Sequence, residues 1–230
     1  MKYTILHGET FPVVECHLKQ GEKIRAESDA MVAMDATIDV SGKMKGGILD
    51  GLARKFLTGE SFFMQELVAS RGDGKVLLAP SLPGGIVDIE LDGSYEFAVQ
   101  KGGFLAATDG VEVGTKIENL ARSLFSGFGL FIVKIGGRGT AFVNAWGAVH
   151  VLDIKENEEI IIDNSHLLAW PTSMDFSLEK ASGSWFSSFT SGEVLVCRFK
   201  GPGTVLIQTR NLNSFTGWIE TIARKIQSGQ

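Results

Sequence analysis

LKQGEKIRAESDAMVAM, at residues 18–34, decides the fold, because it recurs twice more along the chain. It aligns without gaps to LDGSYEFAVQKGGFLAA at 91–107 and to IKENEEIIIDNSHLLAW at 154–170. Each copy has an apolar lead residue, a polar turn, an alternating strand, a second turn and another apolar strand. This pattern is typical of a β-hairpin, so the sequence predicts one pair of strands repeated three times.

A second block, which contains paired glycines, follows in each repeat. It reads LTGESFFMQELVASRGDGKVLLA at 57–79, FSGFGLFIVKIGGRGTAFVNA at 125–145 and TSGEVLVCRFKGPGTVLIQTR at 190–210. We interpret its Gly-x-Gly motifs as hairpin turns, since a positive φ costs little without a Cβ. A nucleotide-binding turn would need a helix after the glycines, whereas strand-like sequences follow them here.

The two blocks together predict an all-β fold in which residues 1–230 form a single compact unit. Three repeated lobes are expected in a pseudo-threefold arrangement. Their boundaries lie at about 10–85, 86–147 and 148–212, and residues 213–230 form a C-terminal helical tail.

Helical spacing of apolar residues occurs in three segments, at 48–57, at 117–128 and in the tail. One face of the tail carries five large apolar residues: Phe215, Trp218, Ile219, Ile222 and Ile226. The opposite face carries Glu220, Arg224 and Lys225. Because the repeats are complete without the tail, its apolar face is a candidate interaction surface. We expect it to pack either on the barrel of its own chain or on another subunit.

Composition limits the function classes. The formal net charge of −5 and the pI of about 5.4 disfavour binding to nucleic acid and to anionic lipid. No apolar run approaches the roughly 18 residues of a spanning helix, and the first residues lack the apolar core of a signal peptide. Two cysteines are too few for a disulfide framework. These features predict a cytoplasmic protein, and peripheral membrane contact stays open.

The succession GGILDGLARKFLTGESFFM, GDGKVLLAPSLPGGIVDIEL and GGFLAATDGVEV closely resembles the bacterial and archaeal members of the mitochondrial biogenesis family, which is named for altered inheritance of mitochondria in yeast. The resemblance covers about residues 10–212. It implies a double-stranded β-helix, or jelly-roll-like, fold that is grouped with the tryptophan RNA-binding attenuator protein. It implies no activity, because the family has no catalytic motif to carry over.

Individual residues give little chemistry. Cys16 aligns with aliphatic residues in the other repeats, as does Cys197, so both are expected in the core rather than as reactive thiols. The four histidines, His7, His17, His150 and His166, lack the spacing of metal ligands. Glu15 with His17 comes nearest to a site, and a solvated strand face explains that pair better. We therefore predict no catalytic residue, no metal and no cofactor.

The carboxylates Asp35, Asp39, Asp109 and Glu112 lie in predicted turns and strand ends, where sequence alone cannot pair them as an acid and a base. Three functions stay open. The first is a non-enzymatic interaction or scaffold protein that forms a homo-oligomer or docks a partner through apolar helical segments and glycine-rich loops. The second is an enzyme or small-ligand binder with a site between lobes. The third is RNA binding by analogy of fold, which the dispersed basic residues disfavour.

Overall fold

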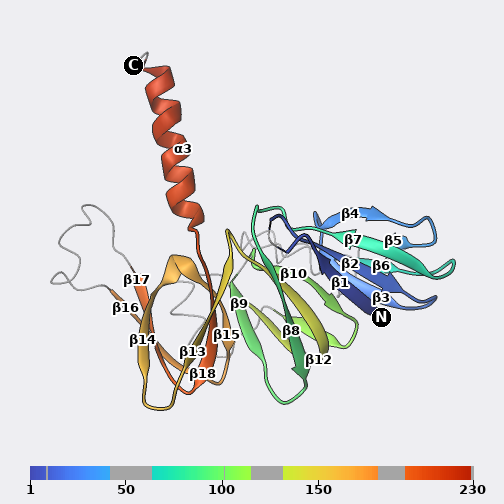
Figure 1. Cartoon of the computed structure of the whole chain (residues 1–230), viewed down its shortest axis with the longest axis horizontal. Helices are drawn as coiled ribbons and strands as arrows, with labels where there is room; N and C mark the ends of the chain where they lie inside the picture. Colours follow the sequence, from blue (N-terminus) through green and yellow to red (C-terminus); the bar gives the residue numbers. More distant parts are fainter. Residues whose placement is uncertain (9, 42–63, 101, 115–131, 181–194, 229–230) are drawn as a thin grey trace, which may run out of the picture.

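The computed structural model of the chain describes residues 1–8, 10–41, 64–100, 102–114, 132–180 and 195–228. Within these residues the chain forms strands β1 to β18, the short 3-10 helix η1 (Asn164–His166) and the C-terminal helix α3 (Leu212–Gln227). All ladders between named strands are antiparallel. The all-β class with a C-terminal helix is confirmed (Figure 1).

Strand β1 (Lys2–Leu6) precedes the repeats, and the other strands divide among them as follows. The first predicted repeat holds β2 (Val13–Leu18), β3 (Lys23–Glu27), β4 (Met31–Met34), β5 (Asp39–Ser41), β6 (Met64–Val68) and β7 (Gly74–Leu78). The second holds β8 (Ile86–Asp92), β9 (Phe97–Gln100), β10 (Phe104–Thr108), β11 (Val111–Gly114) and β12 (Ile132–Asn144). The third holds β13 (Val149–Ile154), β14 (Glu159–Asp163), β15 (Leu167–Pro171), β16 (Asp175–Lys180), β17 (Leu195–Lys200) and β18 (Gly203–Gln208).

The same pairing order occurs in all three stretches. The first, third and last strands form one ladder set, as β2–β7–β4, β8–β12–β10 and β13–β18–β15. The second, fourth and fifth strands form another, as β3–β6–β5, β9–β12–β11 and β14–β17–β16. In the second stretch the long strand β12 serves both sets. Two sheets that exchange consecutive strands in this way form a double-stranded β-helix, the fold implied by the family resemblance.

The predicted hairpins are wrong. The strand pair predicted in residues 18–34 corresponds to β3 and β4, yet β3 pairs with β6 and β10 while β4 pairs with β7. The Gly-x-Gly segments also separate strands that belong to different sets, and Gly137 and Gly139 lie inside β12. The positive φ expected of these glycines does occur at Gly72, Gly137 and Gly139. Gly201 is required for a close approach, because a Cβ there would lie 2.2 Å from the carbonyl oxygen of Lys155. The local sequence pattern predicts where the chain turns, but it does not predict which strands pair with each other.

Each pair of neighbouring repeats is joined by one ladder, and the two ladders have equivalent registers. Strand β10 pairs with β3, where Ala106 lies opposite Ala26 and Ala107 opposite Arg25. Strand β15 pairs with β9, where Ala169 lies opposite Val99 and Trp170 opposite Ala98. In the repeat alignment these are the same positions. At both junctions, the third strand of the later predicted repeat therefore pairs with the second strand of the earlier one.

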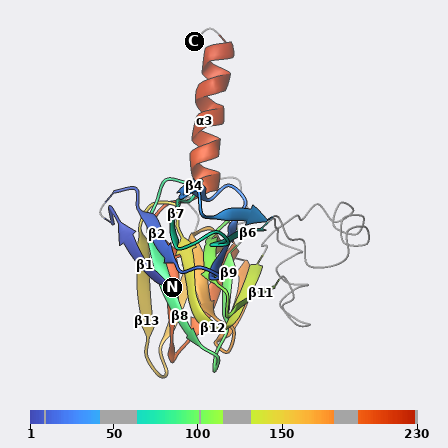
Figure 2. The ribbon, with the colours of Figure 1, turned by 90° about the vertical axis from the view of Figure 1, so that its right-hand side faces the viewer.

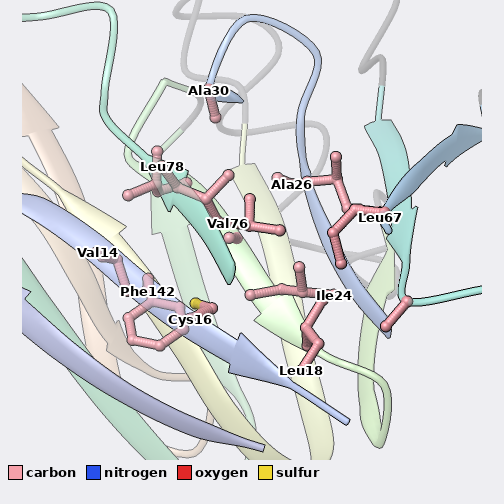
Figure 3. Close-up of a cluster of buried hydrophobic side chains, with 14 residues drawn as sticks. Val14, Cys16, Leu18, Ile24, Ala26, Ala30, Leu67, Val76, Leu78 and Phe142 are labelled. Carbon is pink, nitrogen blue, oxygen red and sulfur yellow. The ribbon is translucent and has the colours of Figure 1, made fainter. Parts of the chain in front are cut away.

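The core consists of three clusters of buried apolar side chains that extend across these junctions. In the first cluster, Phe142 of β12 lies beside Cys16 and Val14 of β2 (Figure 3). Its ring also meets the ring of Tyr3 edge-on at a centroid distance of 4.9 Å. Both Cys16 and Cys197 are fully buried, so their assignment to the core is confirmed.

Burial should make the thiols of Cys16 and Cys197 slow to react in the native protein. It is the main cause that raises the pKa of Cys16 and of Cys197 from 9.0 to about 12. We expect an aromatic disulfide reagent at pH 8 to modify neither thiol in the native chain and both after denaturation. Since the unfolded chain releases these protons near pH 9 and the folded chain keeps them, the free energy of unfolding should fall as the pH rises from 9 towards 12. Rapid labelling of the native protein would contradict this.

The repeat boundaries and the pseudo-threefold axis stay predictions. The predicted helices at 48–57 and 117–128, the GESFF segment at 59–63 and the serine-rich stretch at 184–191 lie outside the described residues.

Candidate interaction surfaces

Among the described residues, helix α3 contacts the barrel through its first turn. The Asn211 side chain caps the helix by accepting from the backbone N–H of Ser214 at 3.2 Å. Its amide also donates to Oγ of Ser165 at 2.6 Å. The ring of Phe215 lies 5.1 Å from that of Trp146 between centroids. Beyond this turn the helix projects away from the barrel in both views (Figures 1 and 2).

The apolar face of α3 is exposed to solvent. None of the helix's described residues is buried, and Trp218 is 58% exposed. The exposed apolar side chains are Leu212, Phe215, Trp218, Ile219, Ile222 and Ile226. All five residues of the predicted surface are thus brought together on one face. Apart from the contact of Phe215 with Trp146, the described residues of the barrel do not bury that face.

The spacing of these side chains is that of a helix seam. Residues 212, 215, 219, 222 and 226 follow each other at intervals of three and four, which is the spacing of positions that meet a second helix. A 16-residue helix without tertiary contacts is marginally stable in water. Gly217 in its interior lowers its stability further. Packing against a surface would therefore stabilise the helix.

Glu15 and His17 form a hydrogen-bonded pair on the surface. His17 Nε2 lies 2.8 Å from Glu15 Oε1, and Lys75 Nζ lies 3.9 Å from the other carboxylate oxygen. A lysine beside the carboxylate repels a metal cation. His166 is also held by the protein itself, since its Nδ1 lies 2.7 Å from the carbonyl oxygen of Gln208. In the described part of the chain, no three His, Cys, Asp or Glu side chains are arranged to hold a metal ion.

Three of the four carboxylates singled out in the sequence have structural partners. Asp35 accepts from the backbone N–H of Lys75 at 2.8 Å. Asp39 forms an ion pair with Arg71 at 2.6 Å, and Asp109 forms one with Lys23 at 3.0 Å. Each of these three carboxylates is thus engaged with a backbone amide or a basic side chain of the protein.

A polar cluster at the contact of β1 with β8 was not predicted. The Tyr3 hydroxyl lies 2.8 Å from Oδ2 of Asp88 and 3.0 Å from Oε1 of Glu90. Thr140 donates to the same oxygen of Glu90 at 2.8 Å. Burial, and then the two carboxylates, raise the pKa of Tyr3 above its ordinary value, so the phenol keeps its proton. The cluster therefore joins two strands rather than supplying a base.

A second exposed apolar surface, also missed from the sequence, lies on the outer edges of β4 and β14. Met34 is 37% exposed and Ile161 is 53% exposed. In the repeat alignment these positions correspond to Trp170 and Ala98, each only 2% exposed. The sequence alone could not reveal this, because the contrast appears only once Trp170 and Ala98 are known to be buried.

Comparison with known proteins agrees with this architecture. Residues 3–210 match the family described as Mitochondrial biogenesis AIM24. The chain belongs to the mitochondrial biogenesis AIM24 family. It is 30% identical to an uncharacterized protein of Streptococcus pyogenes serotype M6 over 227 residues, which cover 96% of this chain and 90% of the relative.

A solved structure has a similar fold. The X-ray structure of a Streptococcus pyogenes protein matches with a TM-score of 0.78 and 30% identity, covering 96% of this chain and 99% of the other. The matched family segment ends at residue 210, so α3 follows it directly. None of the described helices has the length and apolar character needed to cross a bilayer.

Proposed function

We propose that this AIM24-family chain is a non-enzymatic interaction protein that self-associates through the apolar face of α3. The observation that carries the proposal is the exposed seam of Leu212, Phe215, Ile219, Ile222 and Ile226. The contacts of α3 with the other described residues are at its start, where Asn211 meets Ser165 and Phe215 meets Trp146. Full burial of one such side chain contributes about 1.5–3 kcal/mol, while association costs about 4–15 kcal/mol. Several of these side chains acting together can exceed that cost.

A second copy of the chain is the occupant that fits best. Its α3 offers the same three-and-four spacing, so the two seams are complementary by construction. A helix that lies on anionic lipid is typically rich in Lys and Arg on its polar face. Here Arg224 forms an ion pair with Glu220 at 3.3 Å, which leaves Lys225 as the remaining cation between 212 and 227. The weak positive charge favours a protein partner over a membrane.

The test uses two double variants of the full chain that add the same charge to opposite faces of α3. Ile219→Asp with Ile222→Asp places two carboxylates on the seam, whereas Asn213→Asp with Thr221→Asp places them on the polar face. Light scattering should show that the first variant has a lower mass per particle than the native chain and that the control keeps the native mass. Circular dichroism checks that both variants fold.

Two outcomes would overturn the proposal. One is equal mass for the native chain and the seam variant. The other is a native chain that is monomeric in solution but binds vesicles of anionic phospholipid through α3. In that case the seam would be a membrane-binding surface. The proposal extends to a cytoplasmic location, because two buried free thiols suit a reducing compartment.

A further inference from the structure

The same type of strand ladder joins the first repeat to the second and the second to the third. The strands for a third ladder of this type are present at the two ends of the chain's array of repeats. At each internal junction the third strand of one repeat pairs with the second strand of the preceding repeat, as β10 with β3 and β15 with β9. The registers are equivalent in the repeat alignment. Each predicted repeat therefore has two strands that can form such a ladder: its third strand, which pairs with the repeat before it, and its second strand, which pairs with the repeat after it.

Two of these strands lack a junction partner. Strand β4, the third strand of the first repeat, pairs only with β7 among the described strands. Strand β14, the second strand of the third repeat, pairs within the same residues only with β17. The two lie at opposite ends of the longest dimension of the molecule (Figure 1), so they do not meet within one chain.

Both edges carry apolar side chains that their equivalents bury. On β4, Val32 is exposed, whereas the matching Leu105 and Leu168 are buried. Met34 and Ile161 are exposed at the positions where Trp170 and Ala98 are packed. Edge strands are usually protected by a charge or a proline, and β4, with the sequence MVAM, has neither. An unprotected apolar edge of this kind is suited to pairing with another strand.

We propose that β4 of one copy pairs antiparallel with β14 of a second copy, in the register of the two internal junctions. That register places Ala33 opposite Ile162 and Met34 opposite Ile161. The interface is separate from the α3 seam, and it is heterologous, because one copy contributes β4 and the other contributes β14. Repetition of such a contact generates a closed ring or an open filament of chains.

Disulfide trapping tests the register directly. Met34→Cys and Ile161→Cys are introduced into separate full-length chains, one of which carries a mass tag. Directly opposite residues in antiparallel strands lie about 4.5–5.5 Å apart between Cα atoms, within the range of a disulfide. Oxidation of the mixture should give a covalent dimer that contains one tagged and one untagged chain. The buried native thiols of Cys16 and Cys197 should not interfere.

Three controls fix the interpretation. Each variant alone should give no dimer above background, because a heterologous contact does not bring a residue next to its own copy. Val32→Cys mixed with Ile161→Cys should give far less dimer, since diagonal partners lie about 7–8 Å apart. The Met34 and Ile161 pair should still crosslink when both chains carry the Ile219→Asp and Ile222→Asp changes, which separates this interface from α3.

Absence of the mixed dimer would overturn the edge proposal, and the α3 proposal would stand if light scattering still showed association. Crosslinking of Met34→Cys with itself would overturn the heterologous arrangement. Equal crosslinking of Val32→Cys and Met34→Cys with Ile161→Cys would overturn the register.

Discussion

Trp170→Ala should lower the free energy of unfolding by about 3–5 kcal/mol, the usual cost of removing a large aromatic side chain from a core. Trp170 is 2% exposed and lies opposite Ala98 in the ladder that joins the second and third repeats. Its ring meets Phe176 and Phe199 edge-on, with centroid distances of 5.8 Å each. The substitution therefore removes aromatic packing and weakens a junction between repeats. Denaturant unfolding followed by circular dichroism measures the loss.

Trp218→Ala is the matched control, because the same substitution is made at a tryptophan that is 58% exposed on α3. At concentrations low enough for a single chain, the free energy of unfolding should change by less than about 0.5 kcal/mol. The same variant should reduce association, since Trp218 lies beside the seam. Equal destabilisation by the two substitutions would contradict the burial pattern on which the junctions and the α3 surface both rest.

Gly84→Ala should also destabilise the fold strongly, with an expected loss of about 2–6 kcal/mol in the free energy of unfolding. Gly84 forms a parallel bridge with Gly147 between the linkers that follow the first and second repeats. A Cβ at this position would lie 1.9 Å from the carbonyl oxygen of Ala145. The linkers must separate to admit it, and the hydrogen bond from the Gly85 N–H to the Gly147 carbonyl, 2.6 Å long, would be weakened.

Gly85→Ala provides the comparison one residue away. The nearest atom to a Cβ there is at 3.4 Å, an ordinary contact, and its φ is not positive. Such a substitution usually changes stability by less than about 1 kcal/mol and can stabilise by restricting the unfolded chain. Denaturant midpoints of the two variants should differ clearly. Similar midpoints would mean that the linkers are not packed as closely as the bridge indicates.

The repeat alignment predicted the fold class because alternation of side chains survives in all three copies. The positions of Cys16 and Cys197 in the core followed from the same comparison, and the structure confirms them. The pairing of the strands did not follow, because partners such as Ala26 and Ala106 are distant in sequence and local pattern carries no information about them. The predicted hairpins failed for that reason.

The interaction surfaces were predictable in part. Amphipathic spacing identified Phe215, Trp218, Ile219, Ile222 and Ile226 as one face of a helix, but spacing does not say what covers that face. The edges of β4 and β14 required knowledge of the ladders, since Met34 and Ile161 stand out only when their equivalents are known to be buried. The candidate surfaces on β4 and β14 are thus recognised because each of these strands lacks, among the described residues, the junction ladder that its equivalents form.

The mass per particle of the unmodified full chain, measured by light scattering over roughly 1–100 μM, tests self-association most directly, because weak interfaces dissociate in this range. A single chain has a mass of 24.8 kDa. Self-association through α3 and through the edges of β4 and β14 predicts a mass of at least two chains that rises with concentration. A mass of one chain at every concentration would contradict it.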